Sequence, residues 1–172
     1  TWDRWIAKRN EKSFLTNYKK LIDFMSRVGL NGLIIWGFLD DKHGGKRAAQ
    51  EICLYGKEKN VRIIPGVGIY SYGGVWCRGN HRYNLDTYIK KYPERGAIFP
   101  KDSKYSSPDD IPLPEGVPRA IACPSKKENF EWMKEGIIWL CENFDIGGIN
   151  FETGDNGICC CRECKNIRNK KD

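Results

Sequence analysis

Apolar residues near the start of the chain recur every three or four positions, which is the spacing of one face of a helix. The residues in this spacing are Phe14, Tyr18, Leu21, Ile22 and Met25. Gly29 follows at the point where a helix commonly ends. Residues 30–39 then form an almost continuous apolar run, which is typical of a strand buried on both faces. This part of the sequence predicts a helix followed by a buried strand.

The alternation of helical and extended patterns continues after this strand. Ala48, Ala49, Ile52 and Cys53 mark the buried stripe of a second helix, and residues 61–70 form a second apolar run. Two strands joined by a helix form a βαβ unit, whose strands are parallel. Residues 71–118 interrupt the pattern, and five of the eight prolines lie between residues 100 and 118. We expect a long loop region there, with one short helix at residues 85–92.

Regular patterns resume after residue 118. Residues 119–123 predict a short strand, and Ser125 with Glu128 matches a capping box that would begin the next helix. Residues 146–152 predict another strand, and a basic helix is expected from about Arg162. Four strands that alternate with helices predict an α/β fold with a parallel sheet.

Carboxylates follow two of the predicted strands. In parallel α/β folds, ligands bind at the carboxyl ends of the strands. Glu152 ends the last strand and Asp155 lies in the glycine-rich turn after it, while Asp40 and Asp41 follow the first strand. A partly desolvated carboxylate such as Glu152 suits a general acid, and a second carboxylate would act as base, nucleophile or orienting group. Each of them can instead cap a turn or a helix.

Aromatic and histidine side chains follow the same strand ends and are candidate substrate-binding residues. They are His43, Tyr70, Tyr72, Trp76 and His81.

Cysteines are concentrated near the end of the chain, at positions 159, 160, 161 and 164. The C-x-C-x-x-C spacing of Cys159, Cys161 and Cys164 suits three thiolates on one tetrahedral zinc ion. The fourth ligand would be Cys160, Cys77 or His81. A disulfide between one of these cysteines and a distant thiol is the alternative, and it would indicate an exported protein. The sequence leaves the compartment open.

Length and charge restrict the remaining function classes. The chain has 172 residues, which is below the roughly 200 of even a small (β/α)₈ barrel. It begins with Thr1, so we expect it to belong to a longer chain. The net charge of +7 comes from residues 1–20 and 162–172, which argues against a nucleic-acid groove on the folded body. The apolar runs are too short to cross a bilayer, so a membrane protein is not expected.

Three segments, in this order, resemble the β-N-acetylhexosaminidase family of glycoside hydrolases. Residues 30–41 resemble an early barrel strand that leads into an acidic loop, and residues 51–68 resemble the next helix with its IRVIPE strand. Residues 129–152 resemble the helix that leads into the HIGGDE strand with the catalytic pair. The cysteine-rich turn at residues 154–164 is closer to uncharacterised barrel proteins related to α-glucuronidase-type hydrolases.

This resemblance implies that residues 1–172 form one partial (β/α) TIM-type barrel domain, about half of a full barrel. It also implies an oligo- or polysaccharide substrate, with Glu152 protonating the leaving glycosidic oxygen and no organic cofactor. The chain has Phe151 where the family has an Asp, and Gly66 follows Pro65 where the family has an acidic residue. Two alternatives are a non-catalytic carbohydrate-binding barrel and a zinc-stabilised structural or interaction module.

Overall fold

The computed structural model describes residues 10–100, 120–153 and 159–169 of the chain. Within these ranges, three strands form one parallel sheet in the order β1-β2-β3. The strands are β1 (Gly32–Trp36), β2 (Arg62–Gly68) and β3 (Asn150–Glu152). The predicted α/β fold with parallel strands is therefore confirmed.

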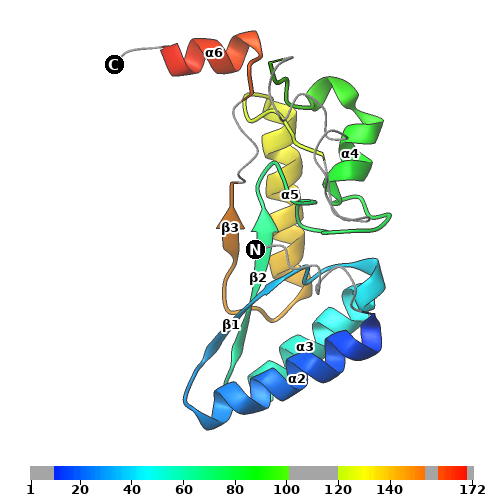
Figure 1. The fold of residues 1–172 in the computed structure, drawn as a ribbon, viewed down its shortest axis with the longest axis vertical. Coiled ribbons are helices and arrows are strands. Elements are labelled where there is room, and N and C mark those ends of the chain that lie inside the picture. The colour runs from blue at the N-terminus through cyan, green and yellow to red at the C-terminus, as the bar shows by residue number, and fades with distance from the viewer. Residues whose placement is uncertain (1–9, 101–119, 154–158, 170–172) are drawn as a thin grey trace.

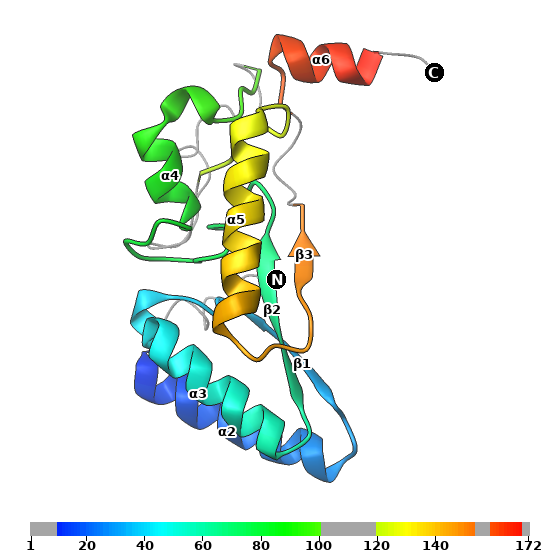
Figure 2. The same ribbon diagram turned by 180° about the vertical axis from the view of Figure 1, so that it is seen from behind.

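Along the chain, helices precede, separate and follow these strands. They are α2 (Glu11–Arg27), α3 (Gly45–Glu58), α4 (Leu85–Lys91), α5 (Lys127–Asn143) and α6 (Arg162–Asn169), with short 3₁₀ turns η1 (Asp41–His43) and η2 (Pro93–Arg95). In Figures 1 and 2, α2 and α3 lie side by side, and α5 runs along β2 and β3. The arrowheads of β2 and β3 point toward the end of the molecule where α4 and α6 lie. No helix in the described ranges is both long and apolar enough to span a membrane.

The predicted strand at residues 119–123 is wrong. Its described part instead lies against residues 95–97: the amide of Ala97 donates to the carbonyl of Ile121 (2.8 Å), and the amide of Cys123 donates to the carbonyl of Arg95 (2.9 Å). The sheet has no place for this segment because β2 pairs directly with β3, with Gly66 beside Asn150. The segment is therefore part of one long connection from β2 to α5.

The starts of α2 and α5 differ. Asn10 and Ser13 form a capping box on α2, since each side chain accepts a hydrogen bond from the other residue's amide. The capping box predicted for α5 is wrong, because that helix begins after Lys126 without a side-chain cap. The Ser125 hydroxyl instead lies 2.8 Å from Sγ of Cys164.

The two faces of the sheet have different surroundings. Leu33, Ile35, Ile63 and Val67 are buried in one core with apolar residues of α2, α3 and α5. Side chains alternate along a strand, and paired residues of neighbouring parallel strands share a face. The opposite face, called the inner face below, therefore carries the alternate positions. They are Gly32, Ile34 and Trp36 on β1, Arg62, Ile64, Gly66 and Gly68 on β2, and Asn150 and Glu152 on β3.

Candidate functional site at the carboxyl ends of the strands

Glu152 lies at the end of β3 on the inner face. It pairs with Gly68 of β2, and its backbone carbonyl accepts a hydrogen bond from the amide of Ile69 (2.7 Å). Its side chain is half-buried. The preceding residue, Phe151, points to the opposite face and is 48% exposed. Phe151 and Glu152 therefore lie on opposite faces of the sheet.

Asp40 and Asp41 hold the loops after β1 and β2 together. Asp40 is fully buried and forms an ion pair with Arg78, while its other carboxylate oxygen accepts from the amide of Lys42 (2.9 Å). The Asp41 carboxylate accepts from the indole N–H of Trp76 (2.9 Å) and from the amide of Asn80 (3.1 Å). Both carboxylates therefore have protein partners in this structure.

The predicted histidines and Trp76 pack against other rings. His43 is 1% exposed, stacks on Phe14 with 4.9 Å between ring centroids, and places Nδ1 2.8 Å from the carbonyl of Gly37. His81 stacks on Trp76 with 4.1 Å between ring centroids. Burial lowers the pKa of His81, so its imidazole is neutral near pH 7.

The two predicted tyrosines are half-buried, and both have backbone φ angles in the left-handed region. Tyr70 has φ +64° and Tyr72 has φ +50°. Non-glycine residues rarely adopt this conformation, which marks a sharp change of direction just after β2. The Tyr70 carbonyl accepts a hydrogen bond from the amide of Ala122 (2.9 Å), which holds the end of the β2–α5 connection against its beginning.

Four cysteines gather beside these strand ends. Sγ of Cys123 lies 3.7 Å from Sγ of each of the three predicted ligands, Cys159, Cys161 and Cys164. All four sulfurs lie within 4.8 Å of one another. Among the described residues, the cysteine that joins the three predicted ones is Cys123, and Cys160, Cys77 and His81, the predicted candidates for a fourth ligand, lie outside this cluster.

The sulfur spacing fits a tetrahedral metal site. A zinc–sulfur bond of about 2.3 Å gives sulfur–sulfur edges of about 3.8 Å in a regular tetrahedron. The three edges from Cys123 are 3.7 Å. A disulfide bond is much shorter, about 2.05 Å. The cluster thus has the ligand type, number and spacing that suit a structural metal ion.

Hydrogen-bond donors surround the same sulfurs. The amide of Cys164 donates to Sγ of Cys161 (3.3 Å), and the amide of Ile98 donates to Sγ of Cys159 (3.4 Å). The first of these bonds is the main cause that lowers the pKa of Cys161 to about 7, whereas burial raises the pKa of Cys123. Donors of this kind stabilise thiolate, which is the form of cysteine that binds metals.

A cavity of about 310 Å³ lies between the strand ends and this cluster. We call it the strand-end cavity. Its lining comes from four segments: Ile69, Tyr70 and Ser71; Ala97 and Phe99; Ile121, Ala122 and Pro124; and Thr153, Cys159, Cys164 and Arg168. Neither Ser71 nor Arg168 of α6 was a sequence-based candidate, because no motif marks them.

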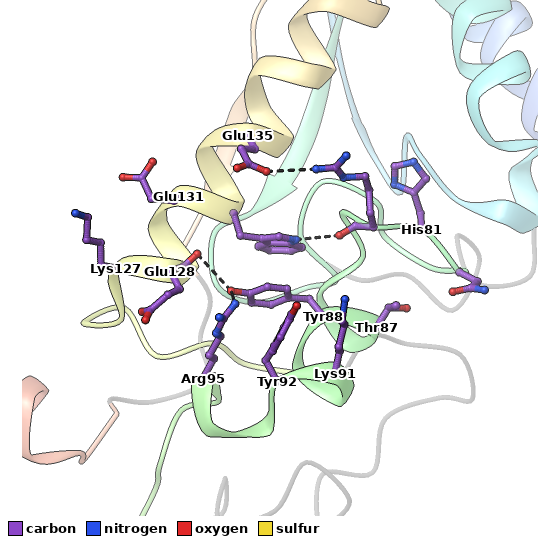
Figure 3. A pocket seen from close by; sticks show the side chains of 13 residues that line it. His81, Thr87, Tyr88, Lys91, Tyr92, Arg95, Lys127, Glu128, Glu131 and Glu135 are labelled. Atoms are coloured by element: carbon purple, nitrogen blue, oxygen red, sulfur yellow. Dashed lines mark hydrogen bonds and ion pairs between the residues drawn. The ribbon is translucent and has the colours of Figure 1, made fainter.

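A larger cleft of about 790 Å³ lies between α4 and the first turns of α5. Figure 3 shows Tyr88, Tyr92 and Arg95 on one side and Glu128 and Glu131 of α5 on the other. Arg95 donates to the hydroxyl of Tyr88 (2.8 Å) and lies over the ring of Tyr92. Among the predicted binding residues, His81 alone contributes to its lining. The groups of this cleft are thus largely engaged with one another.

Parallel strands on one side of connecting helices, with a cavity beyond the strand ends, define part of a TIM-type (β/α) barrel. Two solved structures share this arrangement. A noncanonic maltogenic alpha-amylase, AmyB, from Thermotoga neapolitana has a TM-score of 0.56 at 15% identity, over 83% of this chain and 35% of that chain. An alpha-amylase from Geobacillus thermoleovorans, complexed with acarbose, has a TM-score of 0.54 at 11% identity, over 83% of this chain and 34% of that chain.

The chain therefore spans about a third of the length of these two enzymes. No family model matches it. No curated protein matches it either. At such low identity, the likeness to the two structures establishes the fold.

Proposed function

We propose that this chain is a segment of a glycoside hydrolase-like barrel that acts on an oligo- or polysaccharide, with Glu152 as general acid. One observation carries the proposal: Glu152 ends a parallel strand on the inner face, where barrel enzymes hold their catalytic groups. The two similar structures are alpha-amylases, which supports a saccharide substrate. The narrower resemblance to β-N-acetylhexosaminidases stays a prediction.

Glycoside hydrolysis of this kind needs a second carboxylate. Asp155 is the candidate we favour, and it lies outside the described residues. Asp40 and Asp41 are weaker candidates because their oxygens already accept hydrogen bonds or ion pairs from Arg78, Trp76 and backbone amides. The role of Asp155 therefore stays a prediction.

The test replaces Glu152 by glutamine, which keeps the shape of the side chain but cannot donate the acidic proton. The substrates are phenyl and dinitrophenyl glycosides of both anomers. A general acid contributes roughly 100- to 10,000-fold, so we expect kcat for phenyl glycosides to fall at least about 100-fold. Dinitrophenolate leaves without protonation, so its glycosides should be affected far less. Glu142→Gln, at an exposed carboxylate in the last turn of α5, is the matched control.

Two outcomes would redirect the proposal. Undiminished turnover of phenyl glycosides by Glu152→Gln would refute Glu152 as the acid. Sugar binding by the parent chain without turnover of any substrate would favour the non-catalytic carbohydrate-binding alternative.

A structural zinc ion is the cofactor we propose, held by Cys123, Cys159, Cys161 and Cys164. The support is that the three sulfur–sulfur distances from Cys123 are 3.7 Å, close to a tetrahedral edge, together with the donors around the sulfurs. Four thiolates leave no open position, which is typical of a structural site. Such an ion would join the β2–α5 connection to the segment after β3. Because of this cysteine cluster, a zinc-stabilised structural module is the second candidate function. Metal analysis should find about one zinc per chain.

A further inference from the structure

The cleft between α4 and the first turns of α5, called the α4–α5 cleft below, has a polar lining. Among its described lining residues none has an aliphatic side chain; Tyr88, Tyr92 and Trp132 are aromatic, and the others carry hydroxyl, amide, imidazole or charged groups. Pockets for apolar small molecules are instead lined mostly by hydrophobic side chains. The volume of about 790 Å³ lies in the upper part of the range for ligand pockets, roughly 300–1,000 Å³. The cleft therefore suits a polar ligand with more than one ring-sized unit.

Contacts among the cleft residues fix its walls before any ligand binds. Tyr88 of α4 stacks on Trp132 of α5 with 4.3 Å between ring centroids, and its hydroxyl donates to the backbone carbonyl of Glu128 (3.3 Å). The indole N–H of Trp132 donates to the carbonyl of Arg82 (2.9 Å). These two rings therefore hold α4 against α5 with their polar atoms already bonded. Recognition of a ligand then depends mainly on the other side chains of the lining.

Several of those side chains keep unused hydrogen-bonding capacity. Among the residues that the structure describes, neither the ammonium group of Lys91 nor the carboxylate of Glu128 has a hydrogen bond or an ion pair, although Lys91 lies 5.1 Å from the ring centre of Tyr92. Nδ1 of His81 accepts from the amide of Tyr83 (3.3 Å), so the neutral ring carries its proton on Nε2. The cleft thus offers ammonium and imidazole donors together with a carboxylate acceptor.

Charges of opposite sign lie on the two sides of the cleft. Lys91 and Arg95 are on the α4 side, and Glu128 and Glu131 are on the α5 side (Figure 3). A ligand with a net charge would be attracted by one side and repelled by the other. A neutral ligand with many hydroxyls meets no such conflict, because a hydroxyl can accept from an ammonium group and donate to a carboxylate. The lining therefore favours a neutral polyhydroxylated molecule.

We infer that the α4–α5 cleft binds a neutral oligosaccharide segment, with Lys91 donating to its hydroxyls and Glu128 accepting from them. This inference rests on the proposed function, which supplies the class of ligand. It also goes beyond that function, because Glu152 does not line the cleft. The cleft would hold a stretch of polysaccharide away from the proposed point of cleavage.

The test titrates the whole chain with maltotetraose, cellotetraose and xylotetraose, and follows the backbone amide signals of residues 87–95 and 127–135 by NMR. Tetragalacturonate and glycylglycine are the anionic and zwitterionic comparisons. We expect at least one neutral tetrasaccharide to shift these signals with a dissociation constant in about the millimolar range. Lys91→Met and Glu128→Gln should each weaken its binding at least about fivefold, because each removes hydrogen bonds to a charged group.

Matched controls lie on the same two helices. Lys90→Met on α4 and Glu142→Gln on α5 change exposed side chains outside the cleft lining and should leave the affinity unchanged. Lys91 and Glu128 are exposed as well, so their variants should fold like the parent chain.

Three results would overturn the inference. They are the absence of any shift with the neutral tetrasaccharides, binding of tetragalacturonate or glycylglycine alone, and parent affinity in both Lys91→Met and Glu128→Gln. Failure of the proposed function would look different. It would appear as undiminished turnover by Glu152→Gln, while the tetrasaccharide still binds and both cleft variants still weaken it.

Discussion

Replacing Cys123 by serine tests the proposed metal site most directly. Cys123 precedes α5, whereas the three other clustered cysteines lie within residues 159–164. A metal ion bound by all four therefore links two segments that are far apart in the sequence. Without Cys123, the remaining ligands would hold only a short stretch of chain.

The size of the effect follows from the loop that this link closes. Cys123 is 36 residues from Cys159 and 41 residues from Cys164. If the metal is treated as a cross-link, closing a loop of this length raises the free energy of the unfolded chain by about 4 kcal/mol at 25 °C. Since serine is a poor zinc ligand, we expect Cys123→Ser to lower the free energy of unfolding by up to about 4 kcal/mol in the presence of zinc.

Urea unfolding with and without a chelator measures this loss. Parent and variant should differ strongly when zinc is bound and much less after chelation. Cobalt provides a second signal, because its thiolate absorption reports the number of sulfur ligands. Cys160→Ser is the matched control, since Cys160 belongs to the same cysteine-rich segment but lies outside the cluster.

The reasoning is refuted if Cys123→Ser keeps the stability and cobalt spectrum of the parent chain. It is equally refuted if Cys160→Ser loses as much stability as Cys123→Ser, because the effect would then not depend on the four clustered sulfurs.

Two further predictions concern the sheet. A Cβ on Gly66 would lie 2.5 Å from the Trp36 side chain, so Gly66→Ala should destabilise the fold by about 1–3 kcal/mol in urea unfolding. The control is Gly32→Ala, whose Cβ would lie 3.5 Å from Ile64 and should change the free energy of unfolding little. Equal losses in the two variants would contradict the packing of Trp36 across β2. Lys57 and then Arg62 lower the pKa of Asp145, so its contribution to stability is present above the unfolded-state pKa of about 3.9 and is lost as the pH falls. Asp145→Asn should therefore reduce the drop in the urea midpoint between pH 5 and pH 2.5, and an unchanged drop would contradict this ion pair.

The sequence predicted correctly the strands that are marked by long apolar runs. The runs at residues 30–39 and 61–70 contain β1 and β2, so these strands were placed correctly. The expectation that β1 is buried on both faces was wrong, because Leu33 and Ile35 lie in the core whereas Ile34 is 49% exposed. Residues 119–123 gave a similar but shorter signal and were wrong. Such a short run has no period of its own, and its apolar side chains are buried here by a connection rather than by a sheet.

Only those site residues whose position follows from the local sequence pattern could be predicted. Glu152 follows a strand, so its place at a sheet edge could be inferred from the pattern around it. Cys123 and Ser71 have no such local signal. Their positions depend on how the long connection from β2 folds back, and hydrogen bonds such as that from the amide of Ala122 to the carbonyl of Tyr70 determine that path.

The spacing of the clustered cysteines also has a consequence for biosynthesis. A ribosome that adds about 5–20 residues per second needs roughly 2–7 s to extend the chain by the 36 residues from Cys123 to Cys159. Throughout that interval α5 and β3 are still being made, and Cys123 has none of its three sulfur neighbours. For the proposed zinc site to form, this thiol has to stay reduced and unmodified in the nascent chain until its neighbours emerge.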